Sequence, residues 1–234
     1  MYTTTEALVL GSVKYQDKNL IVKCYTRDHG LVSYFVRNAF GGKKKKMAVY
    51  FQPLNWVDIT AKHRLNGSLE YIKEVSMHQN YQSIPFDFDK SSVALFIAET
   101  LSLSIKQADA DRSFFDFMTQ AIRLFDNDIS LPDFHLYFLI NLSKYMGFYP
   151  LESKNNEYFN PVDGIFENLP NAYCLPLRES ALMKRLLALD DLSTAIFSQN
   201  ERQILLKTLV HFFSQHIHGF EQLKSLDVLH EVYG

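Results

Sequence analysis

The sequence is poor in cysteine and has no long apolar run. Only Cys24 and Cys174 are present, 150 residues apart, which argues against a disulfide framework and against a metal site built on cysteine pairs. No apolar run approaches the roughly 18–20 residues that a membrane span requires. The N-terminal segment also lacks the basic-then-apolar order of a secretory signal. We therefore expect a cytoplasmic protein that contacts no membrane.

Motifs of the common enzyme classes are missing as well. The sequence contains no P-loop, no dinucleotide-binding glycine pattern, no nucleophile elbow and no HExxH. His211, His216 and His218 are close in sequence, but the first two are five residues apart and so lie on different faces of a helix. Asp87 and Asp89 are better explained as helix-start residues than as metal ligands. We predict that the protein is not an enzyme and holds no metal.

Charge is distributed unevenly along an otherwise ordinary globular composition. The 234 residues are 47% apolar and 21% charged, which suits one large domain or two modest ones. Residues 1–80 carry 12 Lys and Arg against 6 Asp and Glu, a net +6, whereas residues 81–234 carry 12 against 20, a net −8. This asymmetry is typical of a nucleic-acid-binding module joined to a separate scaffold, although charges that only solvate their own faces would also produce it.

Alternation of apolar and polar residues with period two dominates residues 1–80 and predicts β-strands. The expected strands are Glu6–Val13, Leu20–Thr26, Leu31–Val36, Leu54–Thr60 and Leu69–Met77. Five short strands separated by turn signals predict a small barrel such as an OB-fold. An SH3-like barrel would give much the same pattern, and counting strands does not choose between the two.

Beyond residue 81 the apolar residues recur at helical spacing. The expected helices span residues 90–107, 112–125, 134–146, 179–189, 201–216 and 225–232. Prolines and an Asp-Gly turn between Pro150 and Pro176 predict an ordered but irregular insertion. We therefore expect an α+β protein of two domains, a β-barrel domain over residues 1–80 and an all-α domain over residues 81–234.

A glycine pair and four consecutive lysines follow the third predicted strand. Lys43, Lys44, Lys45 and Lys46 come directly after Gly41-Gly42, and together they offer ~4 contacts to phosphates, which would make binding salt-dependent and almost blind to base sequence. The other candidate nucleic-acid-binding cations are Lys23, Arg27, Arg37, Lys62 and Arg64. The candidates for stacking on unpaired bases are Tyr25, Phe35, Phe40 and Trp56, of which Trp56 fits a barrel core as readily.

Several short motifs occur in an order that matches a known family. Residues 26–30 read Thr-Arg-Asp-His-Gly between two predicted strands, and the next strand ends at Arg37 before Asn38-Ala39. Further along the chain are Phe96-Ile97-Ala98-Glu99, Phe114-Phe115-Asp116-Phe117, Tyr145-Met146-Gly147-Phe148 and Leu223-Lys224-Ser225. Together these motifs resemble the RecO family of recombination mediator proteins over nearly the whole chain. Asn38 departs from the glycine that the family prefers, and Phe40-Gly41-Gly42 delays the basic run.

The resemblance implies an OB-fold barrel followed by a helical domain, in a bacterial protein associated with the nucleoid. It implies binding of single- and double-stranded DNA and annealing of complementary strands coated by single-strand-binding protein. The implied protein partners are RecR, the C-terminal tail of single-strand-binding protein and, indirectly, RecA, which would be helped to load onto the coated DNA. No covalent chemistry belongs to this role.

The resemblance also bears on metal binding. Many RecO proteins carry a four-cysteine zinc site in the irregular part of the helical domain, whereas the matching segment here, Tyr158 to Pro176, holds Cys174 alone. We therefore predict that zinc is absent and that apolar packing replaces it. The side chains expected to fill that space are Tyr158, Phe159, Ile165, Phe166 and Tyr173.

Two other functions stay open on the sequence. One is a protein-interaction module whose barrel docks an acidic protein without binding DNA directly. The other is a metal-dependent nuclease that keeps its carboxylates in the acidic helical half. Salt-dependent DNA binding would argue against the first, and the second requires magnesium-dependent cleavage of DNA by the pure protein.

Overall fold

The computed structural model describes residues 1–41, 47–64, 69–106, 109–127, 132–151, 155–189 and 196–233. The chain separates into two compact units, Met1–Asn127 and Asp128–Gly234. In the described part of the chain, no helix is both long enough and apolar enough to cross a bilayer.

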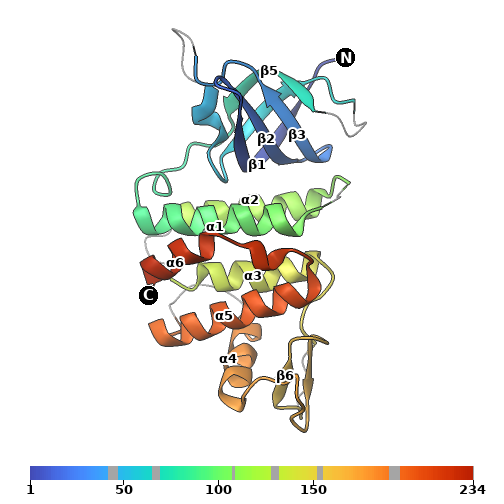
Figure 1. The fold of residues 1–234 in the computed structure, drawn as a ribbon, viewed down its shortest axis with the longest axis vertical. Coiled ribbons are helices and arrows are strands. Elements are labelled where there is room, and N and C mark those ends of the chain that lie inside the picture. Colours follow the sequence, from blue (N-terminus) through green and yellow to red (C-terminus); the bar gives the residue numbers. More distant parts are fainter. Residues whose placement is uncertain are drawn as a thin grey trace. The chain divides into compact units, whose positions relative to one another are not determined.

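The first unit is built on a closed barrel of five strands in the order β1-β2-β3-β5-β4 (Figure 1). The strands are β1 (Thr3–Tyr15), β2 (Asn19–Thr26), β3 (Gly30–Val36), β4 (Trp56–Ala61) and β5 (Glu70–Met77). Neighbouring strands are antiparallel except for β3 and β5, which are parallel. This order is that of an OB-fold, so the predicted fold class is confirmed and the SH3-like alternative is set aside.

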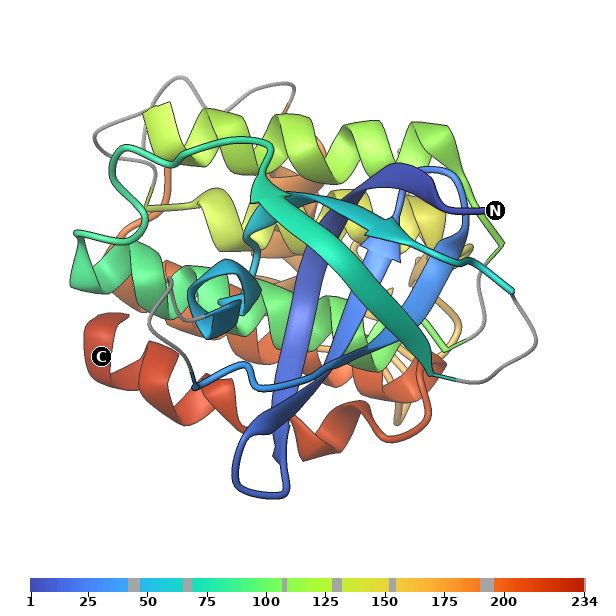
Figure 2. The ribbon, with the colours of Figure 1, turned by 90° about the horizontal axis from the view of Figure 1, so that it is seen from above.

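The barrel closes because β1 is long enough to pair with two neighbours. Its first half pairs with β4 and its second half with β2, and an irregularity between Val9 and Gly11 bends the strand between them. The alternating apolar residues of each strand point inward, and Val22, Cys24, Tyr34 and Ile59 are fully buried in this core. A short 3-10 helix, η1 (Met47–Phe51), lies next to β1 and β5 and adds Phe51 to the core (Figure 2).

Two helices complete the first unit. They are α1 (Phe88–Ser104), whose N-terminus is capped by the Asp87 side chain, and α2 (Arg112–Asn127). Helix α1 packs against β1, and the α2 ring of Phe115 lies 6.2 Å from that of Trp56. Trp56 is only 8% exposed and is therefore part of the packing rather than a stacking surface. The strands do end near residue 80, but because the compact unit continues to Asn127, the domain boundary at residue 80 stays a prediction.

The second unit is helical, with a small hairpin between two of its helices. Its elements are α3 (Phe134–Tyr145), β6 (Tyr158–Asn160), β7 (Ile165–Glu167), α4 (Leu177–Leu187), α5 (Gln199–His216), η2 (Phe220–Gln222) and α6 (Ser225–Tyr233). Helix α5 contacts α3, α4 and α6 and carries the central aromatics Phe212 and Phe213. Its N-terminus is a capping box, in which Ser198 and Glu201 satisfy each other's backbone amides.

The hairpin lies within the predicted irregular insertion. Strand β6 pairs with β7 in antiparallel register, and the Phe159 ring packs 5.5 Å from that of Phe212 on α5. Gly164 has a φ of +67° in the connecting turn, and a Cβ there would meet the Phe212 ring at 3.5 Å. Phe159 and Phe166 are buried as expected, whereas Tyr173 is 65% exposed, so the prediction that Tyr173 fills this core is wrong.

Candidate nucleic-acid interface

Three aromatic side chains form a row across the outer surface of the barrel. The rings of Tyr15 on β1 and Phe35 on β3 meet edge to face at 5.9 Å, and the rings of Phe35 and Tyr71 on β5 meet at 5.5 Å. Tyr15 is 46% exposed and Tyr71 52% exposed, so both side chains are accessible from solvent. Exposed aromatic rings next to one another are the arrangement on which successive unpaired bases stack.

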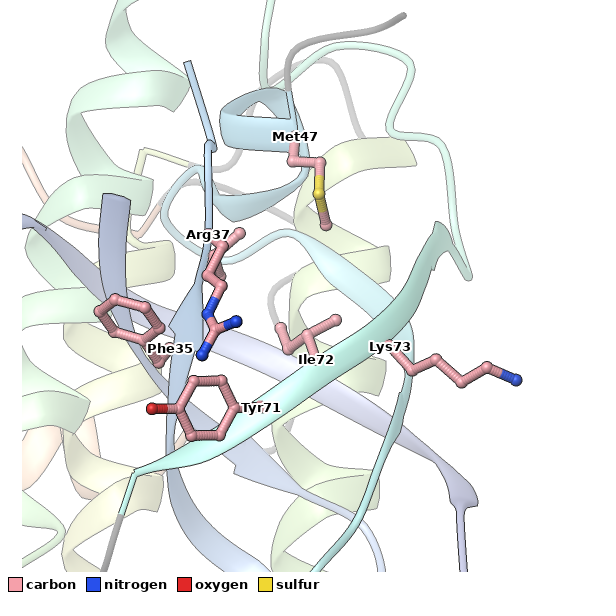
Figure 3. Close-up of a pocket in the computed structure, with 7 residues that line it drawn as sticks. Phe35, Arg37, Met47, Tyr71, Ile72 and Lys73 are labelled. Atoms are coloured by element: carbon pink, nitrogen blue, oxygen red, sulfur yellow. The ribbon is translucent and has the colours of Figure 1, made fainter. Parts of the chain in front are cut away.

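The cation that belongs to this row is Arg37, at the end of β3. Its guanidinium carbon lies 4.9 Å from the centre of the Tyr71 ring (Figure 3), and the Arg37 side chain is exposed. A guanidinium held on a tyrosine ring offers a charge for phosphate and a planar face for a base. Arg37 and Phe35, named from the sequence as a candidate cation and a candidate stacking ring, thus lie close together at the end of β3.

A pocket of about 310 Å³ opens beside Arg37, between β3 and β5. The register between these strands consists of two residue pairs and ends at Phe35 and Tyr71. The strands separate beyond that point, and Met47 of η1 lies at the other side of the gap (Figure 3). The lining residues are Phe35, Val36, Arg37, Met47, Tyr71, Ile72 and Lys73.

Two lysines extend the positive charge away from the pocket. The Nζ atoms of Lys62 and Lys73 lie 5.4 Å and 5.2 Å from the centre of the same Tyr2 ring. Lys73 also pairs with Glu74 at 3.4 Å, but both side chains are exposed and such pairs are weak. Arg64 is exposed near the start of β5, where its backbone amide donates to Glu70 at 2.6 Å. We call Tyr15, Phe35, Arg37, Tyr71, Lys73, Lys62 and Tyr2 the outer row.

Lys23 is turned away from the outer row and holds a helix. Its Nζ donates to the carbonyl oxygen of Ser102 at 2.6 Å and to that of Ile105 at 3.5 Å, at the C-terminus of α1. Burial, and secondly the charge of Lys106, lowers the pKa of the Lys23 ammonium. The predicted phosphate contact by Lys23 would require breaking these bonds.

Tyr25 and Arg27 also face the helices of the first unit. Tyr25 is fully buried, its ring packs 5.2 Å from that of Phe114, and its hydroxyl donates to Asp109 O at 3.2 Å. The prediction that Tyr25 stacks on bases is therefore wrong, because α2 covers the outer side of β2 at this point. The Arg27 guanidinium donates to Asp116 at 2.7 Å, and this bond raises the pKa of Arg27.

The remaining predicted residues follow β3 in the sequence. Lys43, Lys44, Lys45 and Lys46 fall outside the described residues. Phe40 is 40% exposed just before them, and the Nζ of Lys14 lies 5.9 Å from its ring centre. Phe40 is therefore accessible, as a base-stacking role requires.

Sequence reasoning missed four members of the outer row. Tyr2, Tyr15, Tyr71 and Lys73 were not among the predicted site residues. Alternation in β5 places Tyr71 on the outer side, opposite the inward Ile72, and could have identified it. For Tyr2 and Tyr15, at the two ends of β1, no signal in the sequence distinguishes an exposed platform from an ordinary surface tyrosine.

The residues of the helical unit do not fit a four-thiolate zinc site. Its hairpin segment supplies Cys174 as a single thiol, and Cys24 belongs to the core of the other unit. Among the residues described, no group of three His, Cys, Asp or Glu side chains is placed to hold a metal ion. His216 stacks on Phe148 at 4.9 Å and is hydrogen-bonded to Pro161 O at 3.1 Å, so its role here is packing. That the chain binds no zinc stays a prediction.

Comparison with known proteins relates the whole chain to DNA repair proteins. The family model described as recombination protein O N terminal matches residues 1–81, and that of recombination protein O C terminal matches residues 85–227. The DNA repair proteins RecO of Flavobacterium psychrophilum and Flavobacterium johnsoniae are each 40% identical to this chain, and that of Bacteroides fragilis is 34% identical. Each alignment covers the full length of both chains. The chain therefore belongs to the RecO family of DNA repair proteins.

Proposed function

We propose that this protein is a non-catalytic recombination mediator that binds and anneals single-stranded DNA. With RecR, it would help RecA load onto DNA coated by single-strand-binding protein, whose C-terminal tail it would also bind. The proposal extends to double-stranded DNA as a second ligand and to the cytoplasm as the place of action. Membership of the RecO family supports it, because the relatives are DNA repair proteins.

The observation that carries the proposal is the outer row. Its tyrosines and Phe35 offer stacking planes, and Arg37, Lys62 and Lys73 offer charge for phosphates on the same side of the barrel. Neutralising phosphates lowers the repulsion between two strands, and contacts that ignore base sequence let the strands slide until they pair. Such a surface favours pairing and positioning of strands without a covalent step.

The experiment is a salt titration of binding to labelled single-stranded DNA. Replacing Lys43, Lys44, Lys45 and Lys46 by Ala should flatten the log–log salt slope by about 3, since each phosphate contact to a single strand contributes about 0.7. A matched variant with Lys144, Lys184, Lys207 and Lys224 replaced by Ala removes the same charge from the second unit and should keep the slope. The annealing of strands coated by single-strand-binding protein should slow in the first variant only.

If the two variants showed the same salt slope of DNA binding, Lys43–Lys46 would make no specific contribution to binding. Absence of salt-dependent DNA binding by the unmodified protein would contradict the proposal as a whole and would favour the protein-interaction module. Magnesium-dependent cleavage of the labelled strand would favour the nuclease instead.

A further inference from the structure

The pocket beside Arg37 is small and lies at an interruption of the sheet. Its volume of about 310 Å³ is near the lower limit of sites that bind small molecules. It exists because β3 and β5 pair over only two residues and then separate. A pocket of this size at a gap between strands suits one flat group entering edge first, and it excludes a double helix.

The surfaces of the pocket match the two sides of a nucleobase. Ile72 of β5 and Met47 of η1, both partly buried, supply apolar surface (Figure 3), and Val36 lies beneath them in the barrel core. Arg37 and Tyr71 supply planar groups, and the guanidinium carbon already lies over the Tyr71 ring, 4.9 Å from its centre. The Arg37 side chain is already held against the Tyr71 ring before DNA binds. A base that stacks on the guanidinium therefore costs less side-chain entropy than one that stacks on a free arginine.

The charges at the rim indicate what the flat group is attached to. Arg37 of β3 and Lys73 of β5 both line the pocket, and none of the described lining residues is a carboxylate. Lys62, directly after β4, adds a further positive charge, since its Nζ lies nearly as close to the Tyr2 ring as that of Lys73 does. A base joined to phosphates on both sides suits this arrangement better than an uncharged apolar side chain.

We propose that this pocket receives one unpaired nucleobase of a bound DNA strand, and that it gives the outer row a preference for single strands over duplex. The inference rests on the proposed function, since it specifies a subsite for the same ligand. Bases inside a duplex are paired and stacked, and extracting one costs a few kcal/mol. Only a single strand can therefore place a base in the pocket without that cost. Single strands and duplexes can both contact Lys62 and Lys73 through their phosphates.

The test compares three labelled probes of equal length: oligothymidylate, an abasic strand with the same phosphates, and a hairpin duplex. Tyr71→Leu keeps an apolar side chain but removes the ring that supports Arg37. It should weaken oligothymidylate binding about 5-fold or more, and leave abasic-strand and duplex binding within about 2-fold. Arg37→Lys, which keeps the charge and loses the plane, should act in the same direction. Tyr71→Phe keeps the ring and should retain the preference for oligothymidylate. Tyr173→Leu, at an exposed site in the other unit, is the matched control.

Equal losses for all three probes would overturn the inference, since the pocket would then contribute charge alone. Unchanged oligothymidylate binding in both Tyr71→Leu and Arg37→Lys would overturn it as well. In either case salt-dependent DNA binding by the unmodified protein would leave the proposed function standing, so the two failures are distinguishable.

Discussion

His135 is a histidine that the folded protein keeps neutral. It lies in α3, is 1% exposed, and has Arg202 of α5 nearby. Burial, and secondly the charge of Arg202, lowers its pKa from 6.5 to about 3. Below pH 6.5 the unfolded chain therefore binds a proton here that the folded chain does not. The stability linked to His135 is complete above pH 6.5 and is lost as the pH falls towards 3.

This histidine should make the helical unit sensitive to mild acid. Between about pH 6 and pH 4, the free energy of unfolding should fall by up to about 1.4 kcal/mol per pH unit on its account. In urea denaturation measured across this pH range, the free energy of unfolding of His135→Gln should fall less steeply with decreasing pH than that of the unmodified protein. His211→Gln, at an exposed position on α5, should retain it. Parallel pH profiles for the His135 variant and the unmodified protein would contradict the assignment.

At the residue scale, alternation predicts the side of a strand but not what covers that side. The alternation of β3 puts Phe35 and Arg37, both candidates for DNA binding, on the side opposite the buried Tyr34 and Val36, and the structure has them on the outer side. The same rule puts the candidates Lys23 and Tyr25 on the side of β2 opposite the core residues Val22 and Cys24, yet Tyr25 is fully buried. The covering residue, Phe114, lies 89 positions further along the chain, and no local pattern reports such a long-range contact.

Helix α1 lacks a basic residue in its own last turn. Lys23 of β2 supplies that charge from outside the helix, through its bonds to the carbonyls of Ser102 and Ile105. Carbonyl groups at a helix C-terminus have no partner inside the helix and carry partial negative charge. The barrel and α1 are therefore joined by a polar contact as well as by apolar packing.

Replacing this lysine should affect folding before it affects DNA binding. Lys23→Met keeps most of the apolar stem and removes the charge, so the free energy of unfolding should fall by about 1–2 kcal/mol. The salt slope of DNA binding should stay unchanged. Lys18→Met, in the exposed turn between β1 and β2, is the matched control and should leave stability within about 0.5 kcal/mol. If Lys23→Met instead reduced the salt slope of DNA binding and left stability unchanged, Lys23 would contact DNA and this prediction would be contradicted.

At the element scale, the sequence predicts long elements well and short ones poorly. All six expected helices are present, because each has an apolar stripe repeated over several turns. The hairpin of β6 and β7 was not predicted, because each strand has three residues and cannot show alternation. Its stability comes from Phe159 packing on α5 rather than from its own sequence.

At the scale of the whole molecule, the charge asymmetry is milder between the compact units than along the sequence. Residues 1–127 carry 16 Lys and Arg against 13 Asp and Glu, a net +3, and residues 128–234 carry 8 against 13, a net −5. The difference arises because α1, α2 and their flanking segments bring acidic residues to the barrel. One of them, Asp116, pairs with Arg27. Part of the positive charge counted over residues 1–80 is thus neutralised by acidic residues of the same unit.

The extent of the first unit decides which fragment of the protein is stable alone. Tyr25 and Trp56 are buried, with Phe114 and Phe115 of α2 against them, so a chain ending at residue 80 would expose both rings. Exposing a large buried side chain costs about 1.5–3 kcal/mol. Residues 1–127 should therefore unfold in one cooperative transition in urea, and residues 1–80 should be several kcal/mol less stable. Equal stability of the two fragments, measured by circular dichroism, would instead place the boundary at residue 80.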